Sequence, residues 1–383
     1  MHNPNMTVEQ STKTLPLLKL KGSPREMGLE HGRTMKNEIE HNLEVYFKRF
    51  KGETKLTRDQ VLDRAGKYSK AVRETAPAYM ETMEGVASGS KNDLLEIVAL
   101  NVRYELMYSQ YSKLGTAAVN KADGCTAFGI MPEMSKDGHA LLAQNWDWIP
   151  EVEGVFLDIA YMDAPRVLCF SEAGVVGGKI GLNTDGLGML INGLVSNEDD
   201  WSRLETPFHV MCWQALQSRS IEDAVAIVSS GKHSCSANFL FGQQTRPGTA
   251  SIVNIESGPN ASNAIGPDHG IVAHTNHFCD PSAVGISQII DEEWRSTLTR
   301  YERITEILDS HVKSRQRLGL EDVEKILRDH DSRPDSICRH PNPDLAEDDR
   351  YKSVVSVVMD LKNRDLWATD GSPCDTVYRL IGF

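Results

Sequence analysis

The spacing of hydrophobic and polar positions gives the first third of the chain a helical pattern. A capping box formed by Ser23 and Glu26, with proline at the first helical position, predicts a helix that runs to about Phe50. Thr57 starts a second predicted helix, with Gln60 as the capping glutamine three residues later. In the fourth predicted helix, Leu94, Leu95, Val98 and Val102 form an apolar stripe. The predicted helices begin near Ser23, Thr57, Pro77 and Asn92.

At Cys125 the pattern changes to short strands. Residues 113–123 are rich in Ala, Gly and Lys and are predicted to form a loop. Residues 125–131 and 139–146 read as two strands joined by the turn sequence at 136–138. Further strands are predicted at 155–162, 167–171, 179–183, 188–192, 237–241, 251–255, 351–361, 366–369 and 376–380. Further helices are predicted at 206–218, 221–229, 292–311 and 320–329.

This order of elements predicts an α+β fold built in layers. Most connections between strands are short, so antiparallel hairpins are favoured over parallel units with helical crossovers. We expect a loose tail over residues 1–14, a mainly helical segment over 15–124 and a catalytic core over 125–383. The three parts are expected to form one globular unit.

Charge and cysteine content narrow the class of protein. The net charge of −13 argues against nucleic acid and anionic membranes as partners. No apolar run is long enough to cross a bilayer. The seven cysteines are odd in number and lack CxxC spacing, which argues against a disulfide framework and a zinc ribbon. With no apolar signal core near Met1, a reducing, cytoplasmic location is expected.

The junction between loop and strand, Asp123-Gly124-Cys125-Thr126, is the first candidate for chemistry. Gly124 puts no side chain near its carbonyl, so the Cys125 thiolate could attack that carbonyl and free Cys125 as a new N-terminus. The new α-amine and the thiol would titrate close together, near pH ~8 and ~8.5, so one residue would hold both base and nucleophile. The alternative is that Cys125 is a small buried hydrophobe that starts a strand.

Four other polar residues are candidates, and each has a simpler alternative. Asp147 would lie beside Cys125 in the predicted hairpin and could hold the new ammonium, or it could close a strand end. The Asn276 amide could donate to an oxyanion. Arg339 could lower the pKa of a thiol or pair with Asp147. Ser236 is a possible site hydroxyl. For all four residues, ordinary roles in polar loops or on the surface are equally good explanations.

Together these motifs resemble the isopenicillin-N acyltransferase family of N-terminal nucleophile hydrolases. The resemblance runs in order over about residues 21–339. It rests on the stretches 22–28, 31–32, 123–126, 144–147, 172–174, 272–277 and 336–339.

The resemblance implies a four-layer αββα sandwich and autocatalytic cleavage between Gly124 and Cys125. It implies Cys125 as nucleophile, with Asp147, Asn276 and Arg339 in the matching pocket positions. The two cleaved chains would stay associated, and no cofactor or metal is required. Roles in substrate binding or processing are further suggested for Asp123, Thr126, Ser236 and Ser336.

The family includes acyltransferases that use acyl-coenzyme A and plain amide hydrolases. We expect small acyl-amides or acyl thioesters as substrates. No Gly-rich phosphate cradle or Lys/Arg cluster points to coenzyme A, so acyl-amides are favoured slightly. Three alternatives remain open: a dedicated acyl-coenzyme A-dependent N-acyltransferase of secondary metabolism, an inactive binding protein on the same fold, and a papain-like enzyme that uses His274 or His277 as its base.

Overall fold

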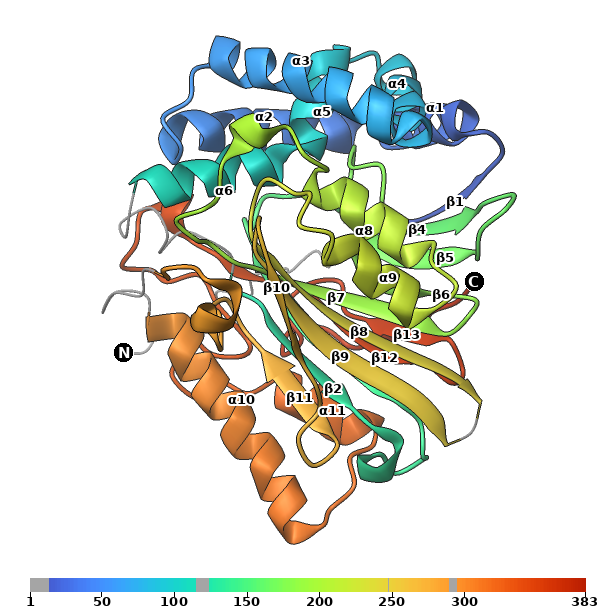
Figure 1. Cartoon of the computed structure of the whole chain (residues 1–383), viewed down its shortest axis with the longest axis vertical. Helices are drawn as coiled ribbons and strands as arrows, with labels where there is room; N and C mark the ends of the chain where they lie inside the picture. Colours follow the sequence, from blue (N-terminus) through green and yellow to red (C-terminus); the bar gives the residue numbers. More distant parts are fainter. Residues whose placement is uncertain (1–13, 115–123, 247, 289–294) are drawn as a thin grey trace, which may run out of the picture.

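Two β-sheets face each other at the centre of the molecule, and helices cover their outer faces (Figure 1). The computed structural model describes residues 14–114, 124–246, 248–288 and 295–383. The larger sheet has eight strands in the order β1-β4-β5-β6-β7-β8-β9-β10. Its strands are β1 (Leu17–Lys21), β4 (Gly154–Ala160), β5 (Val167–Glu172), β6 (Ile180–Asn183), β7 (Leu187–Gly193), β8 (Ala237–Arg246), β9 (Thr249–Ser257) and β10 (Ser262–Ile265).

The smaller sheet has six strands in the order β11-β2-β3-β12-β13-β14. Its strands are β2 (Thr126–Ile130), β3 (Leu141–Trp148), β11 (Ile271–His274), β12 (Lys352–Asp360), β13 (Asp365–Ala368) and β14 (Arg379–Ile381). Neighbouring strands in this sheet are antiparallel, and β2 and β3 form the predicted hairpin. In the larger sheet β1 and β4 run parallel, while the other neighbours are antiparallel.

The helices form the two outer layers. α8 (Phe208–Leu216) and α9 (Ile221–Val228) pack on the larger sheet, while α10 (Arg295–Ser314) and α11 (Leu320–Leu327) pack on the smaller one (Figure 1). The N-terminal helices gather at one end of the molecule. They are α1 (Pro24–Thr34), α2 (Lys36–Gly52), α3 (Arg58–Thr75), α4 (Pro77–Ser90), α5 (Leu94–Asn101) and α6 (Arg103–Leu114). The layers therefore confirm the predicted αββα sandwich.

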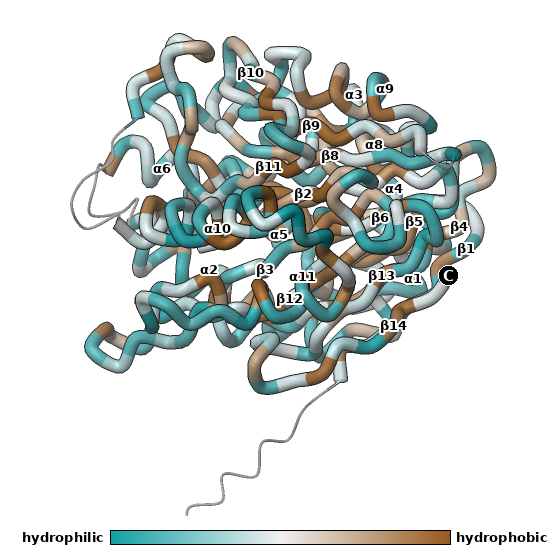
Figure 2. Tube along the Cα trace, turned by 90° about the horizontal axis from the view of Figure 1, so that it is seen from below, coloured by the Kyte–Doolittle hydropathy of each residue, from teal (hydrophilic) through white to brown (hydrophobic). Residues whose placement is uncertain are grey.

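Strand β2 shows why both faces of the smaller sheet are apolar. Phe128 and Ile130 join a hydrophobic cluster with α10 and α11, whereas Ala127 belongs to the main core between the sheets. A Cβ added at Gly129 would come within 2.9 Å of Ile252 on β9, which shows how closely the two sheets approach. Hydrophobic segments accordingly concentrate along interior strands such as β2 (Figure 2).

Several element boundaries differ from the sequence prediction. The first helix breaks at Met35, which has φ −105° and ψ 24° and caps both α1 and α2. Asp93, not Asn92, caps α5 by accepting from the Leu95 N–H, and a second break at Val102 separates α5 from α6. Neither break is marked by glycine or proline.

Three strands were not predicted: β1, β10 and β11. The predicted loop at 113–123 begins too early, since α6 extends to Leu114. Residues 115–123, the tail at 1–13 and the start of the helix predicted at 292–311 lie outside the described residues. Among the described helices, none combines the length and the apolar character that crossing a membrane requires.

Candidate active site

The β2–β3 hairpin brings Cys125 and Asp147 together. Thr126 pairs with Asn145, so Cys125, one residue before β2, lies opposite the end of β3 that carries Asp147. The Cys125 sulfur is 4.0 Å from the main-chain oxygen of Asp147. Both side chains are fully buried. The predicted hairpin therefore does place these two residues side by side.

Gly124 lies against two charged groups. A Cβ added at this residue would be 2.2 Å from Nη1 of Arg339 and 3.2 Å from Oδ2 of Asp147. Real Cβ atoms do not approach other atoms as closely as 2.2 Å, so any larger residue would displace the Arg339 guanidinium. The need for glycine here thus comes from the adjoining side chains as well as from access to its carbonyl.

A serine on β12 connects the aspartate to the loop that carries Arg339. The Ser353 hydroxyl donates to Oδ1 of Asp147 at 2.6 Å and accepts from the Arg339 main-chain N–H at 3.0 Å. The Arg339 guanidinium pairs with Asp335 at 2.9 Å and lies 5.6 Å from the ring centre of Tyr351. Asp147 and Arg339 are therefore each held in place by neighbouring side chains.

Arg300 on α10 joins the site and was not predicted. Its guanidinium donates to the main-chain oxygen of Cys125, to the Thr126 hydroxyl and to Oδ1 of Asn276, the last two at 3.1 Å. Burial lowers the pKa of Arg300 to about 10, although Asp147 and Cys125 oppose that shift. At this pKa the side chain stays a cation at neutral pH.

A sequence signal for Arg300 exists. It lies on the buried stripe of α10 at helical spacing from Ile304 and Leu308, where a hydrophobic residue would be ordinary. A charged residue on such a stripe needs a buried partner, and the partners here are the Cys125 carbonyl and Asn276. Ser353 carries no comparable signal, because small polar residues are common in strands.

Arg300 connects Asn276 to Cys125 by donating hydrogen bonds to both residues. Because its Oδ1 accepts from Arg300, its Nδ2 points the other way and donates to the Gly193 oxygen at 3.2 Å, at the end of β7. Its main-chain N–H donates to the Thr297 hydroxyl at 2.8 Å. Asn276 thus spans the two sheets with a fixed amide orientation.

The remaining predicted residues are placed differently. Thr126 is buried in the site through its bond to Arg300. The Ser336 hydroxyl donates to the Cys338 oxygen at 2.6 Å, so it shapes the loop that carries Arg339. The Ser236 hydroxyl bonds instead to Asp199 at 2.6 Å, within a separate buried cluster. Asp123 lies outside the described residues.

The two histidines considered as bases have other partners. His274 Nε2 is 3.0 Å from a Glu256 carboxylate oxygen, and its Nδ1 is 2.7 Å from the Thr275 carbonyl oxygen. Burial alone would lower the pKa of His274, but hydrogen bonds to Cys279 and Glu256 raise it to about 9. Burial lowers the pKa of His277 to about 4, and its Nδ1 lies 3.0 Å from the Thr297 hydroxyl. Both nitrogens of His274 are occupied, which leaves none of them for Cys125.

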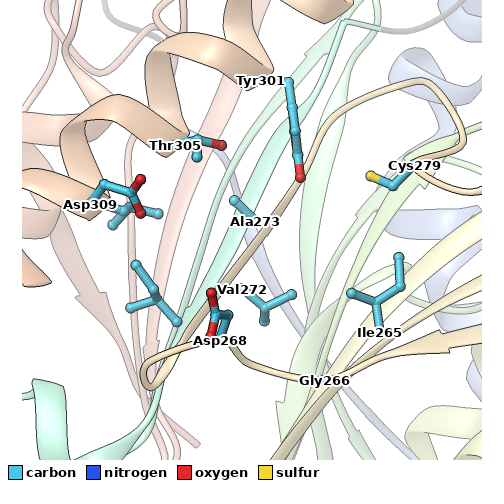
Figure 3. A pocket seen from close by; sticks show the side chains of 11 residues that line it. Ile265, Gly266, Asp268, Val272, Ala273, Cys279, Tyr301, Thr305 and Asp309 are labelled. Atoms are coloured by element: carbon cyan, nitrogen blue, oxygen red, sulfur yellow. The ribbon is translucent and has the colours of Figure 1, made fainter.

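A pocket of about 200 Å³ opens between α10 and β11 (Figure 3). Tyr301 and Asp309 of α10 lie on one side, and Val272 of β11 lies on the other. Tyr301 directly follows Arg300 in α10. Tyr301 lines the pocket, whereas Arg300 contacts Cys125. The residues that line the pocket do not include Cys125 or Arg339.

The two packed sheets and their covering helices define the class of fold, an αββα sandwich. The family model for acyl-coenzyme A:6-aminopenicillanic acid acyl-transferase matches residues 134–375. The chain belongs to this family, as the sequence motifs indicated.

Two curated relatives are similar to the chain, and one of them carries the name of this family. The chain is 27% identical over 325 residues to the 40 kDa form of acyl-coenzyme A:6-aminopenicillanic-acid-acyltransferase from Emericella nidulans, covering 83% of each chain. It is 23% identical over 399 residues to an uncharacterized protein of Archaeoglobus fulgidus, covering 94% of this chain and 64% of that protein.

The solved structures that align with the chain have much lower sequence identity. A mutant of conjugated bile acid hydrolase from Clostridium perfringens aligns with a TM-score of 0.45 and 10% identity, over 68% of this chain and 97% of that one. Penicillin V acylase from Agrobacterium tumefaciens aligns with a TM-score of 0.42 and 12% identity, over 64% and 83% of the two chains.

Proposed function

We propose that this protein is a self-processing amidohydrolase or acyltransferase whose nucleophile is Cys125. The observation that carries the proposal is the environment of the Gly124–Cys125 junction. There a buried thiol, the Asp147 carboxylate and the Arg339 guanidinium adjoin one peptide bond. Family membership supports an enzyme that transfers or hydrolyses acyl groups.

The first reaction would be self-cleavage. The Cys125 sulfur attacks the Gly124 carbonyl carbon, the C–N bond breaks, and the α-amine of Cys125 is released with a thioester in its place. Water then hydrolyses the thioester to give the Gly124 carboxylate and a free thiol. The Asp147 carboxylate, close to the Gly124 backbone, is suited to hold the new ammonium group.

Turnover would use the same atoms. The α-amine of Cys125 takes the thiol proton, and the thiolate attacks the carbonyl of a bound amide or thioester. Arg300 contacts the main chain of Cys125 and Arg339 lies against Gly124, and positive charge this near the thiol favours the thiolate. One amide N–H of Asn276 donates to the Gly193 oxygen, so the second amide N–H is the one we assign as a donor to an oxyanion. Cys125 is fully buried in the intact chain, so the surroundings of its sulfur must open before a substrate can bind.

Intact mass of the purified protein tests the proposal. Wild type should separate under denaturing conditions into one fragment that ends at Gly124 and one that begins at Cys125. Cys125→Ala should remain a single chain. Cys169→Ala is the matched control, because Cys169 is equally buried but lies on β5. Cleavage of Cys125→Ala at the same bond would refute autocatalysis.

The choice of acyl donor needs a separate assay. We propose that small acyl-amides are the better donors, because the acidic chain offers no long-range attraction to a polyanionic donor such as coenzyme A. The Emericella nidulans relative is named for the opposite preference, acyl-coenzyme A. Processed enzyme should be given both donor classes at equal concentration, with and without an acceptor amine. A kcat/KM for thioesters far above every amide, with product only when an amine is present, would identify a dedicated acyltransferase.

A further inference from the structure

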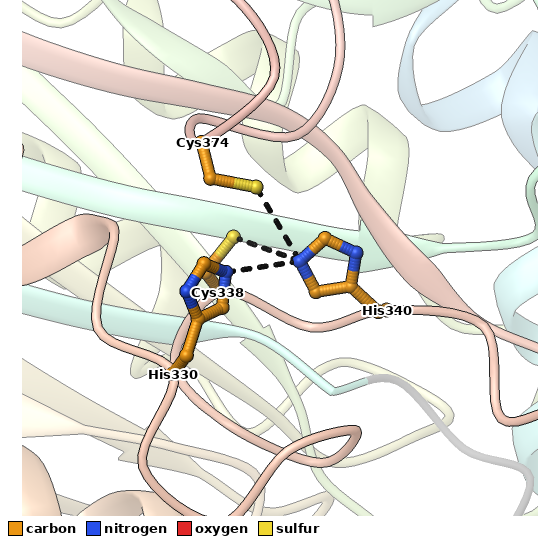
Figure 4. Close-up of side chains that lie close together, drawn as sticks. All are labelled: His330, Cys338, His340 and Cys374. Carbon is orange, nitrogen blue, oxygen red and sulfur yellow. Dashed lines mark hydrogen bonds between the residues drawn. The ribbon is translucent and has the colours of Figure 1, made fainter. Parts of the chain in front are cut away.

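Four side chains with metal-binding atoms meet near the surface, between the segment after α11 and the segment after β13 (Figure 4). They are His330, Cys338, His340 and Cys374. The four donor atoms all lie within 4.8 Å of one another. Nε2 of His340 is 3.0 Å from Nε2 of His330, 3.6 Å from the Cys338 sulfur and 3.4 Å from the Cys374 sulfur.

These separations match the edges of a zinc tetrahedron. With Zn–N of about 2.0–2.1 Å and Zn–S of about 2.3 Å, tetrahedral ligands stand about 3.3 Å apart for N···N and about 3.6 Å apart for N···S. The distance between His330 and His340 is slightly shorter than the first edge, and both N···S distances fall within a few tenths of an ångström of the second. A single ion could therefore bind all four atoms with small adjustments of the side chains.

The rest of the fold already brings the two segments together. The main-chain N–H of Cys338 donates to the Asp329 oxygen at 2.9 Å, and the Arg328 side chain donates to the Pro373 oxygen at 2.8 Å. The ligands are thus presented by segments that are fixed independently of any ion. Preorganised donors of this kind bind a metal without a large ordering cost.

We propose that His330, Cys338, His340 and Cys374 bind one structural zinc ion. Two thiolates and two neutral imidazoles form a closed Cys₂His₂ set, which is typical of structural zinc. Binding converts both thiols to thiolates and releases two protons. The ligands are spread from His330 to Cys374 with no CxxC spacing, which explains why the sequence pattern argued against a zinc ribbon.

The site would also fix part of the candidate active site. Arg339 lies between two ligands, Cys338 and His340, and its own side chain points away from them toward Asp335 and Gly124. An ion that binds both neighbours would hold the main chain of Arg339 in this orientation. Arg339 is then positioned by the metal site without being a ligand.

A second cluster, formed by Glu256, His274 and Cys279, is a weaker metal candidate. It offers three donors, and Glu256 and His274 already pair at 3.0 Å. The His274 Nδ1 is also engaged by the Thr275 carbonyl oxygen. This cluster therefore provides a useful internal control.

Metal content of the untagged, full-length chain tests the proposal. Wild type, prepared metal-free and then titrated with zinc alone against a chromophoric chelator, should bind about one equivalent. His330→Ala and Cys374→Ser should weaken binding by more than about tenfold, because even indirect partners of a ligand change metal affinity ~10–100-fold. Cys279→Ser and His269→Ala should bind like wild type. His330 is exposed, so its variant should fold normally.

Cobalt gives an independent, spectroscopic readout. Cobalt(II) at this site should show the visible bands of a tetrahedral ion and a thiolate-to-cobalt charge-transfer band that Cys374→Ser reduces. Absence of zinc uptake, absence of the thiolate band, or unchanged uptake in both ligand variants would overturn the proposal. Loss of zinc uptake in Cys279→Ser alone would also overturn it. The same holds for a Cys338–Cys374 disulfide that persists under reducing conditions in metal-free protein and prevents uptake.

Discussion

The two faces of strand β3 carry two buried charge clusters that differ in kind. On the face toward the larger sheet, Trp146 and Trp148 contact the cations of a cluster around Glu172. On the opposite face, Asn145 donates to main-chain oxygens of α11 and of Ile337, and the Asp147 carboxylate lies near Gly124 and the Arg339 guanidinium. One strand thus carries a closely paired ion cluster on one face and, on the other, charges that adjoin the Gly124–Cys125 junction.

The Glu172 cluster pairs its charges closely. Arg103 and Lys179 both bind the Glu172 carboxylate, and Tyr46 donates to it as well. Burial alone would raise the pKa of Glu172, but the two cations hold it well below its ordinary value. The cations also lie over aromatic rings, with the Lys179 nitrogen 3.5 Å from the ring centre of Trp146. This cluster joins α2 and α6 to the larger sheet.

The Asp147 cluster distributes its charges around a reactive group. Arg300 and Arg339 approach the Gly124–Cys125 junction from different elements, and Asp147 binds a hydroxyl through Oδ1. The comparison teaches that buried ions by themselves do not mark an active site. A thiol and a glycine junction within reach of the ions distinguish the second cluster from the first.

The largest expected effect comes from breaking the structural cluster. Glu172→Gln leaves Arg103 and Lys179 buried without their carboxylate, so the free energy of unfolding should fall by about 3–5 kcal/mol in urea denaturation. The folded fraction should still be processed at Gly124. Adding Lys179→Met should recover part of the loss, since it removes one uncompensated cation. A loss below about 1 kcal/mol would show that Glu172 is not the centre of this cluster.

The opposite pattern is expected at Asp147. Asp147→Asn keeps the acceptor for Ser353 but removes the charge beside the junction, so processing or turnover should fall on the order of a hundredfold. The melting temperature should change little compared with the loss in rate. Asp268→Asn, at an exposed residue, serves as the control. Unchanged rates in Asp147→Asn would remove this carboxylate from the site.

A smaller effect should separate stability from chemistry at His274. Hydrogen bonds to Cys279 and Glu256 raise its pKa to about 9 in the folded protein, so these interactions stabilise the fold fully below pH ~6.5. This stabilisation should be lost as the pH rises through about 9, on the order of 2 kcal/mol between pH 7 and 10.

His274→Gln should flatten that part of the stability profile, measured by denaturation at each pH, while His269→Gln should leave it unchanged. Turnover of the folded, processed His274→Gln enzyme should remain near wild type. A rate loss well beyond the loss of folded protein would instead favour a papain-like mechanism with a histidine base.

The sequence predicted those features that depend on local physics. The capping boxes at Ser23 and Thr57 start α1 and α3, as predicted. The β2–β3 hairpin follows from the alternation of apolar and polar residues and from a turn sequence. The short β1 was missed because its partner, β4, lies more than a hundred residues away along the chain. Tertiary pairing, not local pattern, decides such a strand.

The same distinction holds for the candidate site. Cys125, Asp147 and Arg339 could be named from motifs, and the structure places them together. Arg300 could not be recognised as part of the site until its partners on β2 and at Asn276 were known. Ser236 was suggested by the family resemblance outside these motifs, and it bonds to Asp199 in another cluster. A candidate residue therefore lies near Cys125 only where the sheet topology brings its segment next to β2 and β3.

The parallel pairing of β1 with β4 has a thermodynamic consequence for a cleaved enzyme. β1 precedes the proposed cut, yet it contributes an edge strand to a sheet whose other strands all follow the cut. Once the bond is broken, unfolding yields two molecules from one complex, so mass action enters the equilibrium. The cleaved protein would then melt at a temperature that rises with its concentration, like a heterodimer, whereas the uncleaved precursor would melt as a single molecule.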